Sequence, residues 1–560
     1  MKAHYPRIVK AADKSMTSAL TRICRDKGNL YCGSLDAMNY LIEPGNGCGL
    51  IQQASSVYSC ADSVYYRDQQ MLTVIEDACD MLMRASHPDG TIDFLATNFY
   101  TPAMFEIQAL CRAYRVFVRY MTGTPEEKHA EEKLRNLIGH LTNGCLNGGF
   151  HTPNHRWVET GALLMAYNII GNPEFKRKAE RYIMEGIDCD EYGEFSERSM
   201  GCYNPVNVNS MMVIAEENNM PELYEHVRRN MDLTFRYLEA DGSLFTKNSR
   251  RQDVDYEKFF PDHAWYYLYL WAGKLFGNRQ YLKFADMIFD SAVCGGRGTP
   301  GGLWMYLLMP ELQTFEPDLR NVEIPTEYHA YYPNSNILRV RKGNFSYTLL
   351  SGKPEFMYVK FGNREMSLRM CSSFFAVAQF APEKLEKTET GYRMTFRGHG
   401  EYKGQFSEKP ETSDWYQMDH SLRPVLHSCD LDYTLDVTDL EDGVKLNIRV
   451  DNTPRVPFKL EFVIPEGTRF ETEQVIFDTQ KGGSIEVKSG NVRLEDIATG
   501  SEVTISGLFA EHMYHRNMRG SVPQTETAFT LYATDFSPVD REVTLRFSMR
   551  NCARTLRDGL

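Results

Sequence analysis

The chain has 560 residues and a formal net charge of −13. This length exceeds what one compact core normally holds, so we expect about two to four domains. Hydrophobic residues make up 42% and charged residues 24% of the sequence, a balance that excludes a disordered chain and fits a globular protein. The acidic charge, without a dense Lys/Arg tract, also argues against a nucleic-acid binder. An anionic ligand would therefore need a local cluster of arginines.

The sequence contains no candidate membrane span. Its longest strongly apolar stretch, about 264–272, is far shorter than the roughly 20 residues that cross a bilayer. Residues 1–6 lack the apolar core of a signal peptide, which favours a cytoplasmic protein and leaves open a signal removed beforehand. The 13 cysteines are scattered and form no CxxC pair, so we expect reduced thiols, no metal and no cofactor.

Helical patterns dominate the sequence up to about residue 320. Apolar side chains recur with helical spacing at Met104, Ile107, Leu110, Cys111 and Tyr114, which predicts one face of an amphipathic helix. Similar patterns predict helices at about 155–170, 174–186, 205–218, 221–239, 262–277 and 279–292.

A glycine turn, a short extended piece and a helix recur together along this half. The turns contain Gly90, Gly148, Gly193 and Gly242, at intervals of about 45 to 60 residues. A period of this length corresponds to one helical hairpin per repeat. We predict a closed ring of hairpins, in which each hairpin buries both faces against its neighbours, with an open solenoid as the alternative.

Short alternating strands dominate the remainder of the chain. Hairpins are predicted where two alternating runs flank a turn, at residues 337–349 around Gly343 and at residues 431–450 around Asp442–Gly443. Many short strands without intervening helices indicate an antiparallel β-sandwich. The expected fold class is therefore α+β multidomain, with a helical ring in residues 1–320 followed by an antiparallel β-sandwich in residues 321–560.

Polar and aromatic residues gather where the predicted helices begin. They form four segments, 98–102, 153–159, 194–207 and 248–263. In a ring of hairpins these positions converge at one mouth, where helix N-termini favour an anion. Arginines are suited to forked recognition of a carboxylate, and the segments contain Arg156, Arg198, Arg250 and Arg251. Together these residues suggest a site for a uronic acid.

Each segment also has a plainer interpretation. Asn154 can cap a helix, and His155 with Glu159 can form a surface pair at i, i+4. The remaining alternatives are a structural ion pair of Glu197 with Arg198, a helix-entry turn at Asn204–Pro205, and a cap with a buried histidine at Asp262–His263. The occurrence of all four segments at one phase of the repeat favours a functional site.

The runs Asn154–Val158, Gly193–Tyr203 and Ser249–Asp253 resemble those of carbohydrate-active enzymes with an (α/α)6 toroid and a β-sandwich. One branch of these enzymes is the heparinase II/III-like polysaccharide lyases. Another is the toroid β-glucuronidases, which remove glucuronic acid from plant arabinogalactan-type glycans. The resemblance implies a toroid fold and a glycan substrate that carries uronic acid.

The two branches require different chemistry. A hydrolase needs two carboxyl groups beside the glycosidic bond, for which Glu197, Asp262 and Glu159 are the candidates. A lyase needs a group that neutralises the uronate carboxylate and a base for the adjacent proton. Asn154, His155, Tyr203 and Arg198 suit those roles.

We interpret the chain as an exo-β-glucuronidase, with a β-eliminating lyase and a non-catalytic glycan-binding protein as alternatives. The expected catalytic residues are Glu197, Asp262, His155 and Tyr203. The expected substrate-binding residues are Asn98, Tyr100, Asn154, Arg156, Glu159, Arg198, Asn204, Arg250, Arg251 and His263. The expected partner is an oligosaccharide that contains uronic acid, without nucleic acid or membrane, and the layout is compatible with a homodimer.

Overall fold

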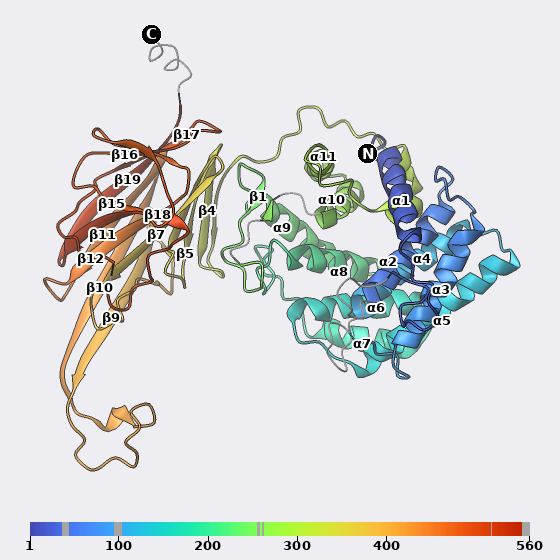
Figure 1. Ribbon diagram of the computed structural model, residues 1–560, viewed down its shortest axis with the longest axis horizontal. Helices are drawn as coiled ribbons and strands as arrows, with labels where there is room; N and C mark the ends of the chain where they lie inside the picture. Colours follow the sequence, from blue (N-terminus) through green and yellow to red (C-terminus); the bar gives the residue numbers. More distant parts are fainter. Residues whose placement is uncertain (36–43, 94–102, 255–257, 260–262, 517, 551–560) are drawn as a thin grey trace, which may run out of the picture. The chain divides into compact units, whose positions relative to one another are not determined.

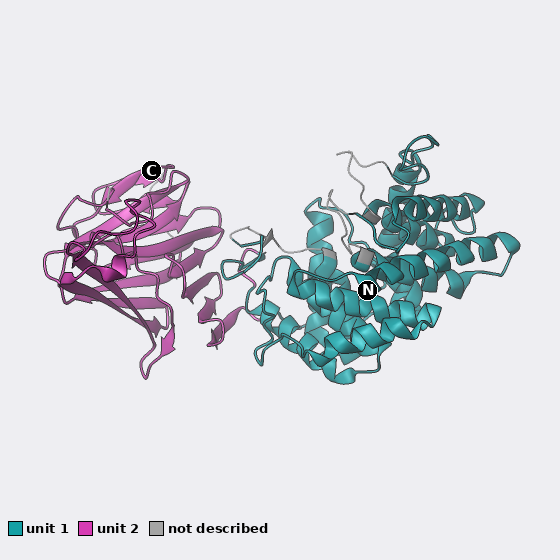
Figure 2. Cartoon of the chain, turned by 90° about the horizontal axis from the view of Figure 1, so that it is seen from below, with its two compact units in different colours: residues 1–237, 242–324 teal, residues 238–241, 325–560 magenta. Residues whose placement is uncertain are grey.

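The computed structural model describes residues 1–35, 44–93, 103–254, 258–259, 263–516 and 518–550. The chain divides into two compact units (Figure 2). The first unit comprises residues 1–237 and 242–324, and the second comprises residues 238–241 and 325–560. Helices dominate the first unit and strands dominate the second, so the predicted change from helices to antiparallel sheets is confirmed.

Helices build the first unit (Figure 1). They are α1 (Tyr5–Leu20), α2 (Pro44–Ser59), α3 (Gln69–Ala85), α4 (Ala103–Tyr120), α5 (Pro125–Asn147), α6 (Pro153–Ile170), α7 (Pro173–Met184), α8 (Tyr203–Glu217), α9 (Tyr224–Phe235), α10 (His263–Phe276), α11 (Arg279–Cys294) and α12 (Leu303–Leu308). Two short 3-10 turns, η1 (Pro221–Leu223) and η2 (Pro310–Gln313), and a two-residue strand pair, β1 (Ser243–Leu244) with β2 (Lys258–Phe259), join them. The helices predicted from the spacing of apolar residues are therefore present, with ends that differ by a few residues.

The helices are arranged as hairpins around a ring. Helices α2, α4, α6, α8 and α10 pack against one another in that order, and α3, α5, α7, α9 and α11 each pack against a member of this inner set. An inner helix is covered all round, so residues on every side of it are buried. In α8, buried residues occupy nearly every position from Asn204 to Ala215. The unit is the predicted toroid of helical hairpins.

Two of the predicted glycine turns have a steric function in the ring. Gly90 and Gly193 adopt positive φ values of 90° and 91°, which side chains rarely tolerate. A Cβ atom at Gly90 would collide with the carbonyl oxygen of His140 in α5, and one at Gly193 would collide with the backbone of Arg229 in α9. Each of these two turns therefore packs directly against the backbone of a ring helix.

We expect Gly90→Ala to lower the free energy of unfolding by about 3 kcal/mol or more, because strain at positive φ adds to overpacking. Gly171→Ala is the matched control. Gly171 has φ 85°, but a Cβ atom there meets nothing within 4 Å, so only the backbone strain of about 1 kcal/mol applies. Urea unfolding followed by circular dichroism measures both changes. Equal losses in the two variants would show that the close approach at Gly90 is unimportant.

Two β-sheets build the second unit. Their strands are β3 (Glu327–Tyr332), β4 (Ile337–Lys342), β5 (Phe345–Leu350), β6 (Met357–Phe361), β7 (Arg364–Ser372), β8 (Glu386–Lys387), β9 (Tyr392–Lys403), β10 (Val425–Leu440), β11 (Gly443–Asp451), β12 (Pro457–Pro465), β13 (Arg469–Glu471), β14 (Ile476–Asp478), β15 (Ser484–Glu486), β16 (Val492–Asp496), β17 (Ser501–Ser506), β18 (Ala528–Phe536) and β19 (Val539–Met549). A third 3-10 turn, η3 (His420–Leu422), lies between β9 and β10.

The larger sheet has the strand order β14-β13-β16-β17-β19-β11-β10-β9-β8, and the other has the order β15-β18-β12-β7-β6-β5-β4-β3. Neighbouring strands of the described part are antiparallel except β15 and β18. Alternating apolar residues of both sheets, such as Leu435, Leu446, Leu368 and Phe462, share one buried core, which defines a β-sandwich. Both predicted hairpins, β4–β5 and β10–β11, are confirmed.

Candidate functional site

The candidate site centres on the carboxyl group of Glu197, in the loop that precedes α8. The Nδ2 atom of Asn154, at the start of α6, donates a hydrogen bond of 2.9 Å to its Oε1. The Nε atom of Arg251 lies 3.4 Å from the same oxygen. Glu197 is buried, and its Oε2 has no hydrogen-bond partner among the described residues. Three segments that the sequence analysis singled out therefore meet at one carboxyl group.

Burial raises the pKa of Glu197, while the hydrogen bond from Asn154 and the charge of Arg251 oppose this shift. Burial of a carboxyl group disfavours its charged form. A carboxyl group with a raised pKa retains its proton to higher pH, which is the property required of a general acid.

Tyr203, the first residue of α8, lies beside the same arginine. The Arg251 guanidinium stands over the Tyr203 ring, 4.8 Å from its centroid, and the side-chain amide of Gln252 donates a hydrogen bond to the phenol oxygen. Arg251 therefore contacts both Glu197 and Tyr203. A cation between a carboxyl group and a phenol suits a site where negative charge is bound or develops.

Asp253 ties the two site loops together. Its Oδ1 accepts hydrogen bonds from Ser199 Oγ at 2.9 Å and Ser249 Oγ at 2.5 Å, and its Oδ2 accepts one from the Gly201 amide at 3.0 Å. The backbone amide of Arg250 donates a further bond of 3.0 Å to the Glu197 carbonyl oxygen. These bonds fix the loop that carries Glu197 against the turn that carries Arg251. Asp253 is not among the site residues expected from the sequence.

A second buried carboxyl group lies on the same loop. Glu194 accepts hydrogen bonds from Tyr237 Oη at 2.9 Å and from Asn248 Nδ2 at 3.0 Å, and the Nε atom of Arg198 lies 3.8 Å from its Oε2. Burial raises the pKa of Glu194 to about 7. Glu194 is not among the expected site residues, although it lies in the segment 194–207.

Arginines on both loops add positive charge. The pKa of Arg250 is lowered, chiefly by the charge of Arg198 and then by burial. Its guanidinium donates to the Ser196 carbonyl oxygen at 3.5 Å. The guanidinium groups of Arg250 and Arg198 therefore lie near enough to repel each other, and an anion between them would relieve that repulsion.

Asn204 is fully buried, with its Oδ1 unpartnered among the described residues.

His155 follows Asn154 on α6 and contacts aromatic rings. Its ring packs edge-on against Phe105 at 5.4 Å and against His151 at 5.0 Å between centroids. Burial, followed by the charges of His151 and Arg251, lowers the pKa of His155 to about 4. The imidazole is therefore neutral near pH 7, where it can donate or accept a hydrogen bond.

The lowered pKa of His155 makes the stability of the protein depend on pH. Below the ordinary value of 6.5 the unfolded chain binds a proton at this residue, whereas the folded chain does not until about pH 4. Wild-type protein should therefore lose unfolding free energy as pH falls through this window. We expect His155→Gln to lose less unfolding free energy than the wild-type protein does between about pH 7 and about pH 5. Urea unfolding measures this difference. An identical loss in both proteins would contradict the shift.

Two of the predicted binding residues contact other groups. Arg156 forms ion pairs with Glu185 at 2.8 Å and Asp188 at 3.3 Å. Glu159 is fully buried and pairs with Lys178 at 2.7 Å, so it does not form the surface pair with His155 that we considered. The structure places neither side chain in contact with Glu197.

The other predicted residues are not described. Asn98, Tyr100 and Asp262 lie outside the described residues, and His263 begins α10 without a described side chain. The described residues contain no group of three or more His, Cys, Asp or Glu side chains arranged to hold a metal ion. Within the same part of the chain, none of the helices combines the length and apolarity that a membrane crossing requires.

The solved structures with a similar fold include two lyases and a heparinase. No protein-family model and no curated protein matches the sequence. A Paenibacillus xanthan lyase aligns with a TM-score of 0.58 at 10% identity, over 99% of this chain and 58% of its own. Heparinase III aligns with a TM-score of 0.53 at 11% identity, over 98% of this chain and 86% of its own. A chondroitinase AC lyase aligns with a TM-score of 0.53 at 10% identity, over 99% of this chain and 84% of its own.

The likeness establishes the fold. This chain shares with these proteins a helical toroid followed by antiparallel sheets, as the sequence analysis predicted. It spans 58% of the length of the xanthan lyase. Identities near 10% do not carry over a reaction, because one fold hosts many chemistries and function resides in the site.

Proposed function

We propose that this protein is a glycan-processing enzyme that acts at uronic acid residues, and that it removes terminal β-linked glucuronic acid by hydrolysis. One observation carries the proposal. The buried carboxyl group of Glu197, with its pKa raised, contacts an asparagine amide and an arginine and keeps one oxygen without a partner. A carboxyl group with a raised pKa beside a cation suits a substrate that has both a glycosidic oxygen and a carboxylate.

In this proposal Glu197 donates its proton to the glycosidic oxygen as the aglycone leaves. Arg251, Arg198 and Arg250 bind the sugar carboxylate, and neutral His155 and Tyr203 bind sugar hydroxyl groups. The second carboxyl group, which attacks C1 or activates the water that does so, is assigned from the sequence to Asp262, which lies outside the described residues. The names of the proteins with a similar fold, heparinase, chondroitinase and xanthan lyase, also agree with a glycan substrate.

Elimination is the second candidate, and the contact of Arg251 with the Tyr203 ring favours it. A nearby cation stabilises the negative charge that a phenol acquires when it loses its proton. Tyr203 would then take the proton next to the uronate carboxylate and pass it to the leaving glycosidic oxygen as the C4–O bond breaks and the C4–C5 double bond forms. Asn154 and His155 would neutralise the carboxylate by hydrogen bonds.

Two substrates distinguish the reactions. 4-Nitrophenyl β-glucuronide has a free hydroxyl at C4 and therefore no leaving group there, so only hydrolysis at C1 releases 4-nitrophenol. Uronic polysaccharides gain ultraviolet absorbance when elimination forms an unsaturated uronate. We expect release of 4-nitrophenol from the glucuronide and no gain in ultraviolet absorbance with the polysaccharides. The reverse result would overturn hydrolysis in favour of elimination. No change in either assay, with glycan masses also unchanged, would indicate a binding protein.

A further inference from the structure

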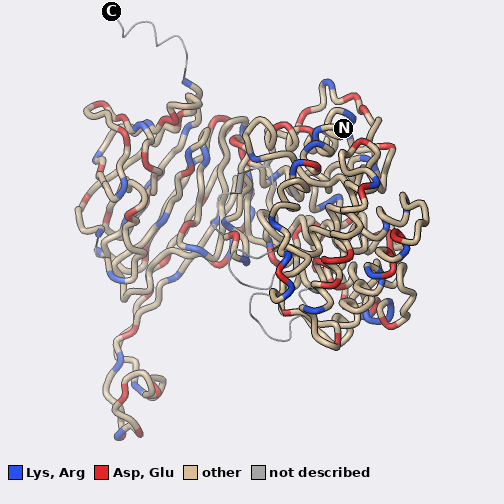
Figure 3. Tube along the Cα trace, turned by 45° about the vertical axis from the view of Figure 1, so that its right-hand side comes forward, with Lys and Arg blue, Asp and Glu red and all other residues tan. Residues whose placement is uncertain are grey.

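The hairpin of β9 and β10 continues past the sheet as a long arm, residues 401–428 (Figure 1, Figure 3). Its two strands pair as far as Lys403 and Val425, and the loop between them contains η3. In Figure 1 the arm projects well beyond the strands on either side of it in the second unit. A two-stranded ribbon has no third strand to cover it, so its side chains remain open to solvent or to a partner.

The tip of the arm has a defined internal structure. The Arg423 guanidinium stacks on the Phe406 ring at 3.9 Å and faces the Trp415 ring at 5.4 Å. Arg423 Nε also donates to His420 Nδ1 at 3.0 Å, and the His420 ring packs against Trp415 at 4.3 Å between centroids. These contacts hold Trp415 in one place, which lowers the entropic cost of binding through it.

The arm exposes several large hydrophobic residues. Tyr416 is 95% exposed and Trp415 is 60% exposed. The other exposed large hydrophobic residues of the arm are Tyr402, Leu422, Val425 and Leu426. Exposed apolar clusters mark interaction sites, and Trp and Tyr dominate the energetics of protein interfaces. The aliphatic residues among them favour a protein partner over a sugar.

The charge of the tip excludes one class of partner. The loop carries the carboxylates of Glu408, Glu411, Asp414 and Asp419, and its cations are only Lys409 and Arg423. An anionic glycan would be repelled here, so this surface is not an extension of the proposed uronic acid site. The tip is suited to an apolar recess with a basic border.

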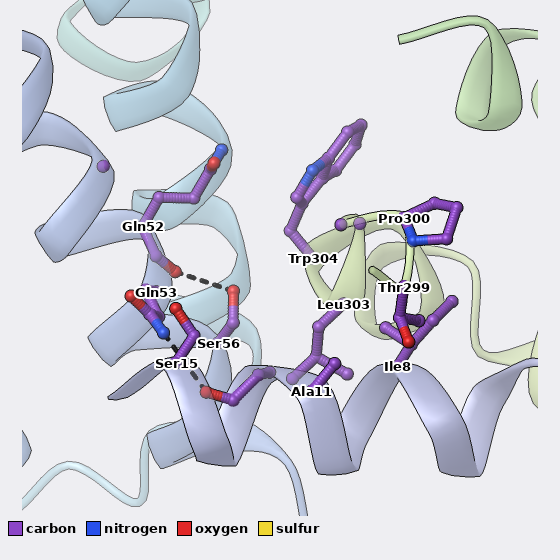
Figure 4. Close-up of a pocket in the computed structure, with 14 residues that line it drawn as sticks. Ile8, Ala11, Ser15, Gln52, Gln53, Ser56, Thr299, Pro300, Leu303 and Trp304 are labelled. Carbon is purple, nitrogen blue, oxygen red and sulfur yellow. Dashed lines mark hydrogen bonds between the residues drawn. The ribbon is translucent and has the colours of Figure 1, made fainter. Parts of the chain in front are cut away.

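The first unit contains such a recess. A groove of about 260 Å³ lies between α1, α2 and the segment 299–304 (Figure 4). Small and apolar residues, including Ile8, Ala11, Ala12, Gly49, Gly301, Gly302 and Leu303, make up much of its lining. Two of its polar side chains are already bonded to the backbone, since Gln53 donates to Ala12 at 3.2 Å and Ser56 donates to Gln52 at 2.7 Å.

A basic stripe flanks this groove. Arg7, Lys10 and Lys14 are exposed on α1, next to the stripe of Ile8 and Ala11 that lines the groove. Within the described residues, none of the three forms an ion pair with an acidic side chain. Charges of opposite sign on two surfaces steer association and fix its register.

We propose that the arm of one copy of this chain docks into the α1–α2 groove of a second copy. Trp415 and Tyr416 enter the groove, and the carboxylates of the tip face the basic stripe of α1. The association does not depend on the glycan chemistry, so failure of either proposal leaves the other intact.

Analytical ultracentrifugation over a range of concentrations tests the proposal. We expect wild-type protein to self-associate, and Trp415→Ser with Tyr416→Ser to weaken association by at least about 30-fold. The matched control is Met184→Ser, at a side chain 84% exposed on α7, which should leave association unchanged. A wild-type protein that stays monomeric, or an arm variant that associates normally, would overturn the proposal.

A charge exchange tests the pairing of the two surfaces. Glu408→Lys with Glu411→Lys should prevent association, and so should Lys10→Glu with Lys14→Glu, because each variant then pairs like charges. In a mixture of the two variants, the heterodimer contains only complementary contacts, because each mutated surface meets the other mutated surface and each native surface meets a native one. Association should return in the mixture. If it does not, the groove is not the receptor of the arm.

Discussion

Glu197→Gln is expected to abolish the release of 4-nitrophenol from its β-glucuronide, with a loss in kcat of about 100-fold to 10,000-fold. Glutamine has nearly the same shape and can still contact Asn154 and Arg251, which lie against Glu197 Oε1. It has no acidic proton to give to the departing aglycone. The loss should therefore appear in kcat, with little change in KM.

The control for this variant is Glu216→Gln. Glu216 lies at the opposite end of α8 and accepts a hydrogen bond of 3.0 Å from Trp271 Nε1. The substitution Glu216→Gln removes a carboxyl group from the same helical unit without changing the site. Unfolding midpoints close to wild type in both variants would show that the fold survives. Full turnover by Glu197→Gln would exclude this residue as the general acid.

The pair of Glu197→Gln with Tyr203→Phe also separates the two reactions. Hydrolysis requires the carboxyl group, and the phenol is only a binding group, so Tyr203→Phe should change kcat by much less than Glu197→Gln does. In elimination the phenol is the base, and the order of the two effects would be reversed. The comparison uses the ratio of the kcat values of the two variants, both measured on the same substrate.

Arg339→Met should destabilise the second unit by about 3 to 5 kcal/mol. Arg339 is fully buried and forms an ion pair of 2.7 Å with Glu239, which is 3% exposed. Glu239 belongs to the segment 238–241 of this unit and also accepts a hydrogen bond from Ser346. Removal of the guanidinium leaves a carboxylate buried without its cation, which costs more than the pair itself contributes.

Lys445→Met is the matched control, because Lys445 pairs with Glu542 at 3.3 Å across neighbouring strands with side-chain exposures of 32% and 58%. Exposed pairs contribute about 0 to 1 kcal/mol. The double replacement of Arg339 and Glu239 by Met and Gln should recover part of the loss, since no charge remains buried. Urea unfolding measures all three variants, and equal losses for Arg339→Met and Lys445→Met would contradict this account.

The sequence determined the architecture, because its periodic patterns reflect burial directly. A period of 3.6 residues predicted α4, α6, α8 and α10, and a period of two predicted β10 and β11 with the turn at Gly443 between them. The spacing of the glycine turns predicted the ring, because an interval of about 45 to 60 residues corresponds to one helical hairpin. These signals are local, so they do not require knowledge of distant contacts.

The sequence also indicated which segments meet, because positions at one phase of a repeat lie at one end of a ring. Asn154, Glu197, Tyr203 and Arg251 do come together. The structure alone decided the individual partners. It paired Glu159 with Lys178 inside the helical unit, and it made Asp253 the link between two loops. A partner depends on side-chain direction and on competing charges from distant segments, and neither is encoded in local spacing.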